Sequence, residues 1–195
     1  MDEGLAQIRH GRSKKDFPFL KLEDDEYVEF ALSRAKISLL ITIGAIAVGL
    51  AVALVIFLFA LLGQSTLDDM GRNFLYIILS ALIIAAIIAA GVAVMIYRGN
   101  KLFITNKHVI QMMMSSPVAT SMNIIDLSSI EDASFSQNGI MQKLFHYGTF
   151  RLSTVGNETT YTFTYSDISP VELKEVSKLI SEAKKNKKSD EIIIY

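Results

Sequence analysis

The chain has 195 residues, of which 51% are hydrophobic and 20% are charged, which is enough for one ordinary domain with additional segments. Its 19 Lys and Arg nearly balance its 20 Asp and Glu, so the charge indicates neither a nucleic-acid partner nor a solvating polyelectrolyte. The absence of Cys excludes disulfides, thiolate metal sites and thiol catalysis.

Residues 1–33 carry their charges in blocks, with a basic group before an acidic run at 23–29. Basic residues close to an anionic leaflet gain about 1 kcal/mol each, which would let this segment dock reversibly on a membrane. The alternative is a solvated, disordered end. We expect a partly disordered N-terminal segment. Its basic residues are Arg9, Arg12, Lys14 and Lys15.

Two long uncharged runs follow, at 37–62 and 74–97. At about 1.5 Å of rise per residue, each run is long enough to cross a hydrocarbon core of about 30 Å. We therefore predict a transmembrane hairpin within residues 34–98. The alternative is a pair of buried core helices, but a domain this small could not enclose two helices that are apolar on every face. The first run is also about twice as long as the apolar region of a signal peptide.

Basic residues flank the two runs unequally. Arg34 and Lys36 precede the first run, Arg98 and Lys101 follow the second, and the connecting loop has only Arg72. The excess of Lys and Arg marks the cytoplasmic side. We expect a multi-pass protein of the inner (cytoplasmic) membrane with both termini in the cytoplasm.

Small residues recur every four positions along both runs. Such stripes allow two helix backbones to approach closely in lipid, although alanine is common in membrane helices in any case. One stripe would pack the hairpin and another could face a second copy of the chain. The candidate helix-packing residues are Ala45, Gly49, Ala53, Ala81, Ala85, Ala89 and Ala93.

After residue 98 the pattern changes to short, β-rich segments separated by turn residues. The turn Asn106-Lys107 joins the first pair of segments, and Gly156-Asn157 is a hairpin signal between the last pair. Residues 99–186 are therefore expected to form one cytoplasmic domain of six or seven antiparallel strands. The predicted strands are 101–105, 108–114, 119–125, 130–137, 148–155 and 159–165.

An amphipathic helix is predicted to close the domain. Ser169 can cap its first turn, Pro170 suits the first position, and Glu172 completes a capping box. The fold class is therefore α+β, with a two-helix membrane hairpin, a small antiparallel β-barrel and a C-terminal helix that plugs it. Residues 187–195 form the expected C-terminal tail, whose last residues, IIIY, could add a strand to a sheet edge.

Three stretches carry a resemblance to a known family: FITNKHVI at 103–110, IDLSSI at 125–130 and LFHYGT at 144–149. With the hairpin before them and the helix after them, they resemble the bacterial pleckstrin-homology-like (PH-like) domain of small membrane proteins, formerly a domain of unknown function. The resemblance implies a PH-like barrel at the inner leaflet that serves binding or scaffolding, without known catalytic chemistry. Members usually carry a Gly after the second strand and an Arg in the first turn, and this chain has neither.

The segment 137–147 is a candidate interaction loop. Its apolar residues are spaced like one face of a short helix, so it could contact lipid or a neighbouring subunit. The structural alternative, which we favour, is a short helix that caps the mouth of the barrel. The residues concerned are Ile140, Met141, Leu144 and Phe145.

The candidate membrane or lipid contacts are Arg98, Lys101 and Lys107, but two cations near the first turn are too few for a specific inositol-lipid pocket. No metal site, cofactor motif or catalytic constellation is recognisable, since His108 and His146 lack a third ligand. We expect a non-catalytic module for protein interaction or assembly, with membrane lipids, an unidentified protein and a second copy of the chain as partners. The alternative is a lipid-binding or lipid-sensing accessory factor of the cell envelope. An enzyme would require a site around His146 and the 137–148 loop.

Overall fold

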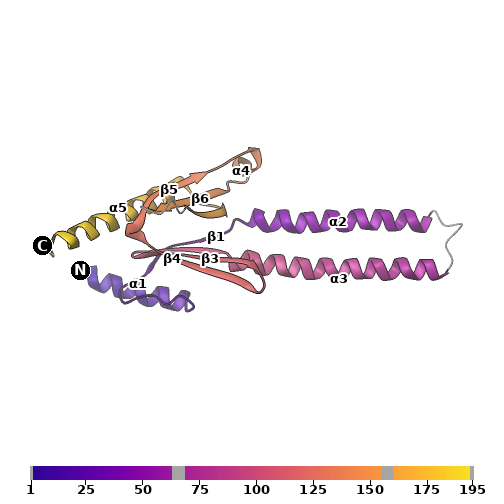
Figure 1. The fold of residues 1–195 in the computed structure, drawn as a ribbon, viewed down its shortest axis with the longest axis horizontal. Helices are drawn as coiled ribbons and strands as arrows, with labels where there is room; N and C mark the ends of the chain where they lie inside the picture. The colour runs from indigo at the N-terminus through magenta and orange to yellow at the C-terminus, as the bar shows by residue number, and fades with distance from the viewer. Residues whose placement is uncertain (1, 63–68, 155–159, 194–195) are drawn as a thin grey trace.

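The computed structural model describes residues 2–62, 69–154 and 160–193. Two long helices project side by side from one end of an α/β domain (Figure 1). The helices are α1 (Asp2–Asp16), α2 (Lys36–Leu62), α3 (Asp69–Gly99), the short 3-10 helix η1 (Leu127–Ser129), α4 (Ile140–Leu144) and α5 (Pro170–Ile193). The strands are β1 (Val28–Ser33), β2 (Lys101–Thr105), β3 (His108–Ser116), β4 (Ala119–Asp126), β5 (Ile130–Ser136), β6 (Gly148–Thr154) and β7 (Thr160–Ser166).

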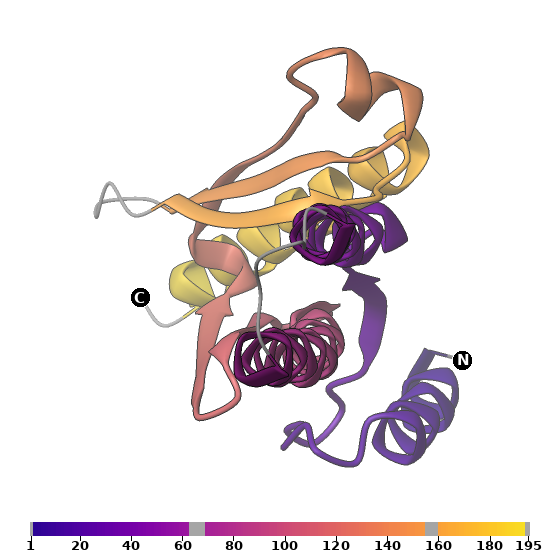
Figure 2. The same ribbon diagram turned by 90° about the vertical axis from the view of Figure 1, so that its right-hand side faces the viewer.

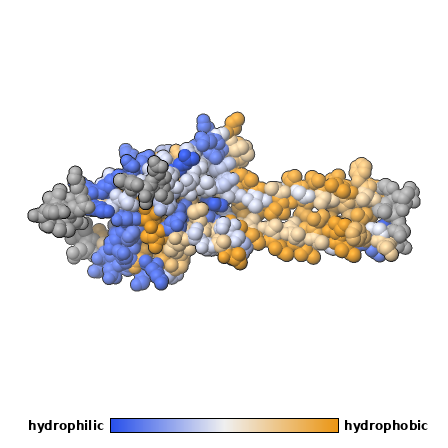
Figure 3. Space-filling view, in the orientation of Figure 1, coloured by the Kyte–Doolittle hydropathy of each residue, from blue (hydrophilic) through white to orange (hydrophobic). Residues whose placement is uncertain are grey.

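Helices α2 and α3 are long and apolar enough to cross a membrane. Their most apolar windows have mean hydropathies of 3.0 and 2.9, and none of the residues in those windows is buried inside the protein. The core helix of a soluble protein would be covered, whereas these helices leave their apolar side chains open all round. Figure 3 shows the resulting apolar rod beside the more polar domain.

The N-terminal segment differs from the expected partly disordered tail. It forms helix α1 and strand β1, and β1 pairs antiparallel with β2 from Val28 opposite Thr105 to Ser33 opposite Lys101. The sequence did not indicate this strand, because it overlaps the acidic run at 23–29. The strand also has only six residues, VEFALS, which is too short for a clear alternation of apolar and polar residues. The domain is therefore assembled from chain on both sides of the hairpin, and the boundary expected at residue 99 does not separate two structural units.

The six strands predicted after residue 98 are confirmed, five of them within one residue at both ends. Together with β1 they make seven strands, which form one sheet in the order β1-β2-β3-β4 and a second in the order β5-β6-β7. The predicted turn at Gly156-Asn157 lies outside the described residues.

The expected closed barrel is not found in the described part of the chain. Asp126 accepts a hydrogen bond from the Ser128 N–H (2.8 Å) and caps η1, which redirects the chain from the first sheet into the second. The two sheets are also linked by an isolated bridge between Arg34 and Ser166, and by the Gln111 side-chain amide of β3, which donates to the Thr162 carbonyl of β7 (2.9 Å). The architecture is thus two antiparallel sheets, of four and three strands, that share one core.

The main core lies between the two sheets and α5. Fully buried side chains come from both sheets, among them Ile104, Val109 and Phe150, and Val176 of α5 packs into the same cluster. The helix begins as the sequence predicts: Glu172 Oε2 accepts from the Ser169 N–H (2.8 Å), and Ser169 Oγ accepts from the Glu172 N–H (3.2 Å). This capping box is confirmed.

Helix α5 continues to Ile193, so residues 187–193 extend the helix and do not form a separate tail. Ile192 and Ile193 of the IIIY segment are helical, while the last two residues lie outside the described range. Helix propagation adds one hydrogen bond for each residue fixed, which allows a capped helix to run on through the polar lysines.

A second apolar cluster lies on the outer face of the first sheet. Phe103 is almost fully buried beneath Phe17 and Phe19, with ring centroids 5.0 and 5.7 Å away, and Leu20 completes the cover. The N-terminal segment therefore packs on the first sheet as part of the domain. Viewed along the hairpin, α1 lies to one side of the paired helices and the β5–β7 sheet to another (Figure 2).

The junction between α3 and β2 is rigid. Gly99 lies so close to Met114 that an added Cβ would come within 2.7 Å of its sulfur. The next residue, Asn100, is buried, and its amide donates to the carbonyls of Ile96 (2.6 Å) and Met114 (2.9 Å). Asn100 thereby joins the last turn of α3 to strand β3, so no flexible linker separates hairpin and domain.

We predict that Asn100→Ala destabilises the full-length protein by about 1–3 kcal/mol, because two carbonyls lose their donor in a buried site. The measurement is thermal unfolding in detergent. Asn123→Ala on β4 is the matched control and should change the midpoint little. Equal unfolding midpoints for wild type and Asn100→Ala would contradict the proposed rigidity.

Candidate functional site

A cavity of about 670 Å³, lined by both charged and apolar side chains, lies where α2 leaves the domain. We call it the junction cavity. It is open to solvent on one side and lies between the end of β1, the first turn of α2, the end of α3 and the start of α5. The lining residues include Arg34, Lys36, Tyr97, Phe145, Asp167 and Glu172.

Arg34 occupies the central position in this cavity. Its backbone forms the bridge to Ser166, and the neighbouring Ala35 N–H donates to the carbonyl of Tyr165 at 2.6 Å. Within the described residues, the buried Nε–H of Arg34 has no hydrogen-bond acceptor. Burial lowers the pKa of Arg34, and the electrostatic influence of Tyr165 offsets this only in part. A buried donor without a partner costs about 1–3 kcal/mol, and the residue that carries it also lines the cavity.

The backbone beside Arg34 is unusual. Tyr165 has a φ of 57°, in the left-handed region that residues with a bulky side chain rarely adopt, and its ring stacks on Tyr147 at a centroid distance of 5.4 Å. Such strain persists only where the surrounding contacts fix it, and it is concentrated at functional sites. The second sheet therefore holds the carbonyl that positions Ala35 and, with it, Arg34.

An apolar groove continues from the junction cavity between α2 and α3. It has a volume of about 400 Å³, and Arg34 and Tyr97 line both spaces. Apart from these two residues, mostly apolar side chains form its walls, including Ile46 and Ile96. We call this space the hairpin groove. The junction cavity and the hairpin groove thus meet at Arg34.

Exposed apolar side chains surround the same end of the domain. Val118, at the tip of the β3–β4 hairpin, is 96% exposed, and Ile140 of α4 is 84% exposed. Both tips reach the level at which α2 begins and α3 ends (Figure 1), and apolar surface gathers there beside the helices (Figure 3). The other exposed apolar residues of this rim are Met141, Leu144, Phe145 and Val171.

The three basic residues expected to contact lipid do not lie together. Arg98 ends α3, and Lys101 begins β2 with its ammonium 5.3 Å from the centre of the Phe19 ring. Lys107 lies at the far end of β2, in the turn before β3. Its Nζ contacts a carboxylate oxygen of Glu23 (3.4 Å) and donates to the Asp24 carbonyl (2.9 Å). The structure therefore places Arg98 and Lys101, but not Lys107, at the end of the domain from which the hairpin extends.

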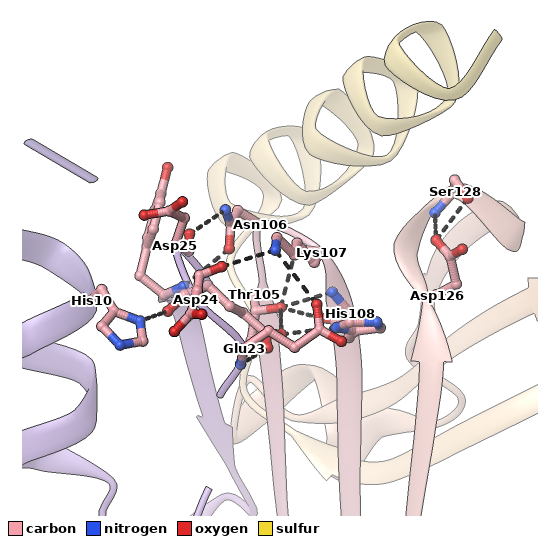
Figure 4. A network of polar contacts seen from close by, with 12 residues as sticks. His10, Glu23, Asp24, Asp25, Thr105, Asn106, Lys107, His108, Asp126 and Ser128 are labelled. Carbon is pink, nitrogen blue, oxygen red and sulfur yellow. Dashed lines mark hydrogen bonds and ion pairs between the residues drawn. The ribbon is translucent and has the colours of Figure 1, made fainter. Parts of the chain in front are cut away.

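A second polar cluster lies around Lys107 at the end of the sheet far from the hairpin (Figure 4). Glu26 is buried, accepts from Thr105 Oγ1 at 2.6 Å and lies 3.0 Å from His108 Nδ1. Burial raises the pKa of Glu26, but hydrogen bonds from Thr105, the Glu23 N–H and His108 outweigh it and hold the pKa below its ordinary value of 4.5. We call this cluster the distal clamp.

The distal clamp uses the same turn, Thr105 to His108, that carries the family resemblance. The Asn106 side chain accepts from the Tyr27 N–H and donates to the Asp25 carbonyl, both at 3.0 Å. The turn therefore binds the N-terminal segment of its own chain and makes the start of β1 part of the domain.

The small residues expected to pack helices line a loosely packed seam. Gly49, Ala53, Ala85 and Ala89 line a shallow space between α2 and α3, and an added Cβ on Gly49 would meet nothing within 4 Å. Ala93 lies nearer the domain, in the hairpin groove. Ala45 and Ala81 are exposed. The close approach that the stripe implies is not made at Gly49 within this hairpin.

Sequence reasoning identified Arg34 only as an orientation signal, and it missed Asp167 and Glu26. No local pattern marks these residues, because their partners come from distant parts of the chain. Among the described residues, no group of three or more His, Asp or Glu is placed to hold a metal ion.

No family model and no curated protein matches the chain. Among solved structures, it is similar to a DUF1696 family protein with a pleckstrin-homology domain from Shewanella loihica, with 14% sequence identity over 44% of this chain and 70% of that one. The TM-score is 0.33. A value this low does not establish a common fold, so the function must follow from the residues themselves.

The depressed pKa of Glu26 predicts a pH-dependent stability. The unfolded chain binds the proton more readily than the folded one, so the contribution is complete above the ordinary pKa of 4.5 and is lost as the pH falls through the lower folded value. Glu26→Gln should cost about 1–3 kcal/mol at neutral pH and flatten the acid side of the curve. Unfolding midpoints measured across this range, with Glu175→Gln as the exposed control, test this. The prediction would be refuted if the unfolding midpoint of Glu26→Gln fell with decreasing pH as steeply as that of the wild type.

Proposed function

We propose that this chain is an integral inner-membrane protein that holds a PH-like domain against the cytoplasmic face as a non-catalytic module for protein interaction or assembly. The observation that carries this proposal is the pairing of Ser33 with Lys101 at the two ends of the apolar hairpin. Both helices enter adjacent strands of one sheet, so the orientation of the domain follows from that of the hairpin.

The charge distribution supports the cytoplasmic placement. Arg34, Lys36, Arg98 and Lys101 lie at the domain end of the hairpin, and an excess of Lys and Arg marks the cytoplasmic side. The exposed apolar side chains of α4 and of the β3–β4 tip surround this end of the domain. In water they would be an unfavourable surface, whereas at the interface of a bilayer they gain apolar contact. The rim thus supports a domain that rests on the membrane.

The free edge of the first sheet supports an interaction role. In the described sheet β4 pairs only with β3, and most of its residues are exposed. Met122 and Ile124 are exposed on the face where their cross-strand neighbours Met112 and Ile110 are covered. An unpaired edge beside apolar side chains accepts an added strand through backbone hydrogen bonds. We therefore place the protein partner at β4.

Lipid recognition is a second candidate function, and the junction cavity favours it. Arg34 lines both this cavity and the apolar groove of the hairpin, and among the described residues its buried Nε–H has no acceptor. A protein with such a site would sense or bind a membrane component in addition to carrying its partner.

The membrane contact of α4 can be measured by fluorescence, because the chain has no Trp. We expect the Trp fluorescence of Ile140→Trp to have its maximum at shorter wavelength in proteoliposomes than in the protein unfolded by denaturant. We also expect brominated lipids to quench it. Leu5→Trp, on α1 far from the hairpin, is the matched control and should not be quenched. Equal quenching at both positions, or at neither, would contradict the proposed contact.

The proposed partner edge can be tested by photo-crosslinking in native membranes. A photoreactive amino acid at Ile124 should give a discrete adduct, whereas the same group at Lys178, on the exposed face of α5, should not. An adduct of twice the chain mass identifies a second copy, and any other mass identifies a different protein. Absence of an adduct at Ile124 would refute an interaction at β4.

A further inference from the structure

We infer that the junction cavity and the hairpin groove together bind one phospholipid with an amine-bearing head group, of the phosphatidylethanolamine class. The phosphate would lie at Arg34 and Lys36, the ammonium at Asp167 and Glu172, and an acyl chain in the hairpin groove. The inference rests on the proposed membrane placement and adds to it a specific ligand.

The cationic side of the cavity is suited to a phosphate. Arg34 has a buried Nε–H donor without an acceptor among the described residues, and Lys36 lines the same cavity. A guanidinium presents several donors in a plane and binds phosphate oxygens through two parallel hydrogen bonds. Burial lowers the pKa of Arg34, which means that its charge is poorly solvated. A bound anion would compensate for this lost hydration. A ligand without an anionic group could not do this.

The acidic side of the cavity selects the remainder of the head group. Asp167 and Glu172 line it from the start of α5. Glu172 already uses one oxygen in the capping box, whereas Asp167 is exposed at the cavity mouth. Two cations and two anions on one cavity complement a zwitterion better than a singly charged anion, because each ligand charge then meets one of opposite sign. A primary ammonium can also donate hydrogen bonds to these carboxylates, which a choline cannot.

The apolar part of the ligand has a place beside the polar part. The hairpin groove shares Arg34 and Tyr97 with the cavity, and its other walls come from the membrane-facing turns of α2 and α3. Arg34 is therefore located between a polar chamber and an apolar trough, the arrangement that a phospholipid presents at the surface of a bilayer. A soluble phosphate compound would fill only the chamber.

The test is a lipid titration of the full-length protein in detergent by native mass spectrometry. Dioleoyl phosphatidylethanolamine is the main probe. Dioleoyl phosphatidylcholine lacks the N–H donors, dioleoyl phosphatidylglycerol lacks the cation, and free phosphoethanolamine lacks the acyl chains. We expect the first probe to bind at least about tenfold more tightly than the others.

The variants separate this site from general attraction to the membrane. Arg34→Gln should weaken phosphatidylethanolamine binding about tenfold or more, and Arg34→Lys should lie between it and wild type. Arg98→Gln removes an equal charge at the same end of the hairpin but outside the cavity, so it should bind like wild type. Asp167→Asn should reduce the preference for phosphatidylethanolamine over phosphatidylcholine. A thermal unfolding curve for each variant establishes that it is folded.

Several results would overturn the inference. Equal losses in Arg34→Gln and Arg98→Gln would mean general electrostatic attraction, and tighter binding of phosphatidylglycerol would reject the zwitterionic head group. Equal binding of free phosphoethanolamine would reject a lipid. Alkaline carbonate extraction of the same chains from membranes tests the membrane placement separately, so a protein that stays in the membrane but shows no lipid preference refutes the lipid site alone.

Discussion

The structure depends on a single constraint, which is that two neighbouring strands of one sheet are separated in the chain by the apolar hairpin. β1 ends at Ser33 and β2 begins at Lys101, and these residues are paired. The ends of α2 and α3 must therefore lie about one strand spacing apart, roughly 5 Å in a β-sheet, widened only by the few residues that join them. The sheet consequently holds the hairpin together at one end, even where the helices themselves pack loosely.

The partly buried charged groups at the two ends of the domain differ in their hydrogen bonding. At the distal clamp, the buried carboxylate of Glu26 receives hydrogen bonds from Thr105, the Glu23 N–H and His108. At the junction, Arg34 is also partly removed from water, but its Nε–H has no acceptor in the described chain. A folded protein satisfies nearly all of its buried polar groups, and Arg34 is one of three residues in the described chain with a buried polar atom that has no partner. The satisfied charge of Glu26 helps to hold the N-terminal segment in place, and the proposed binding site is at the unsatisfied one.

The domain also has two kinds of apolar surface. The outer face of the first sheet is covered by the chain's own N-terminal segment, as Phe103 beneath Phe17 and Phe19 shows. The side chains at the β3–β4 tip and on α4 have no such cover, and they lie where the helices leave the domain. A membrane surface would cover the second kind, and the rigid junction at Asn100 would keep them facing it. The apolar hairpin, the rim and the cavity thus belong to one end of the molecule.

The sequence by itself determined what depends on local pattern. The apolar runs of α2 and α3, the strands after residue 98 and the capping box at Ser169 each have a periodicity or spacing that neighbouring residues define. The apolar residues of α4 were also recognisable from the sequence, although their position beside the domain end of the hairpin was not. Only the tertiary structure decided that β1 belongs to the sheet, that the strands form two sheets without closing a barrel, and that Arg34 lies in a cavity with Asp167. The physical reason is sequence separation: the contact between Glu26 and Thr105 spans 79 residues, and no pattern within either segment indicates the other.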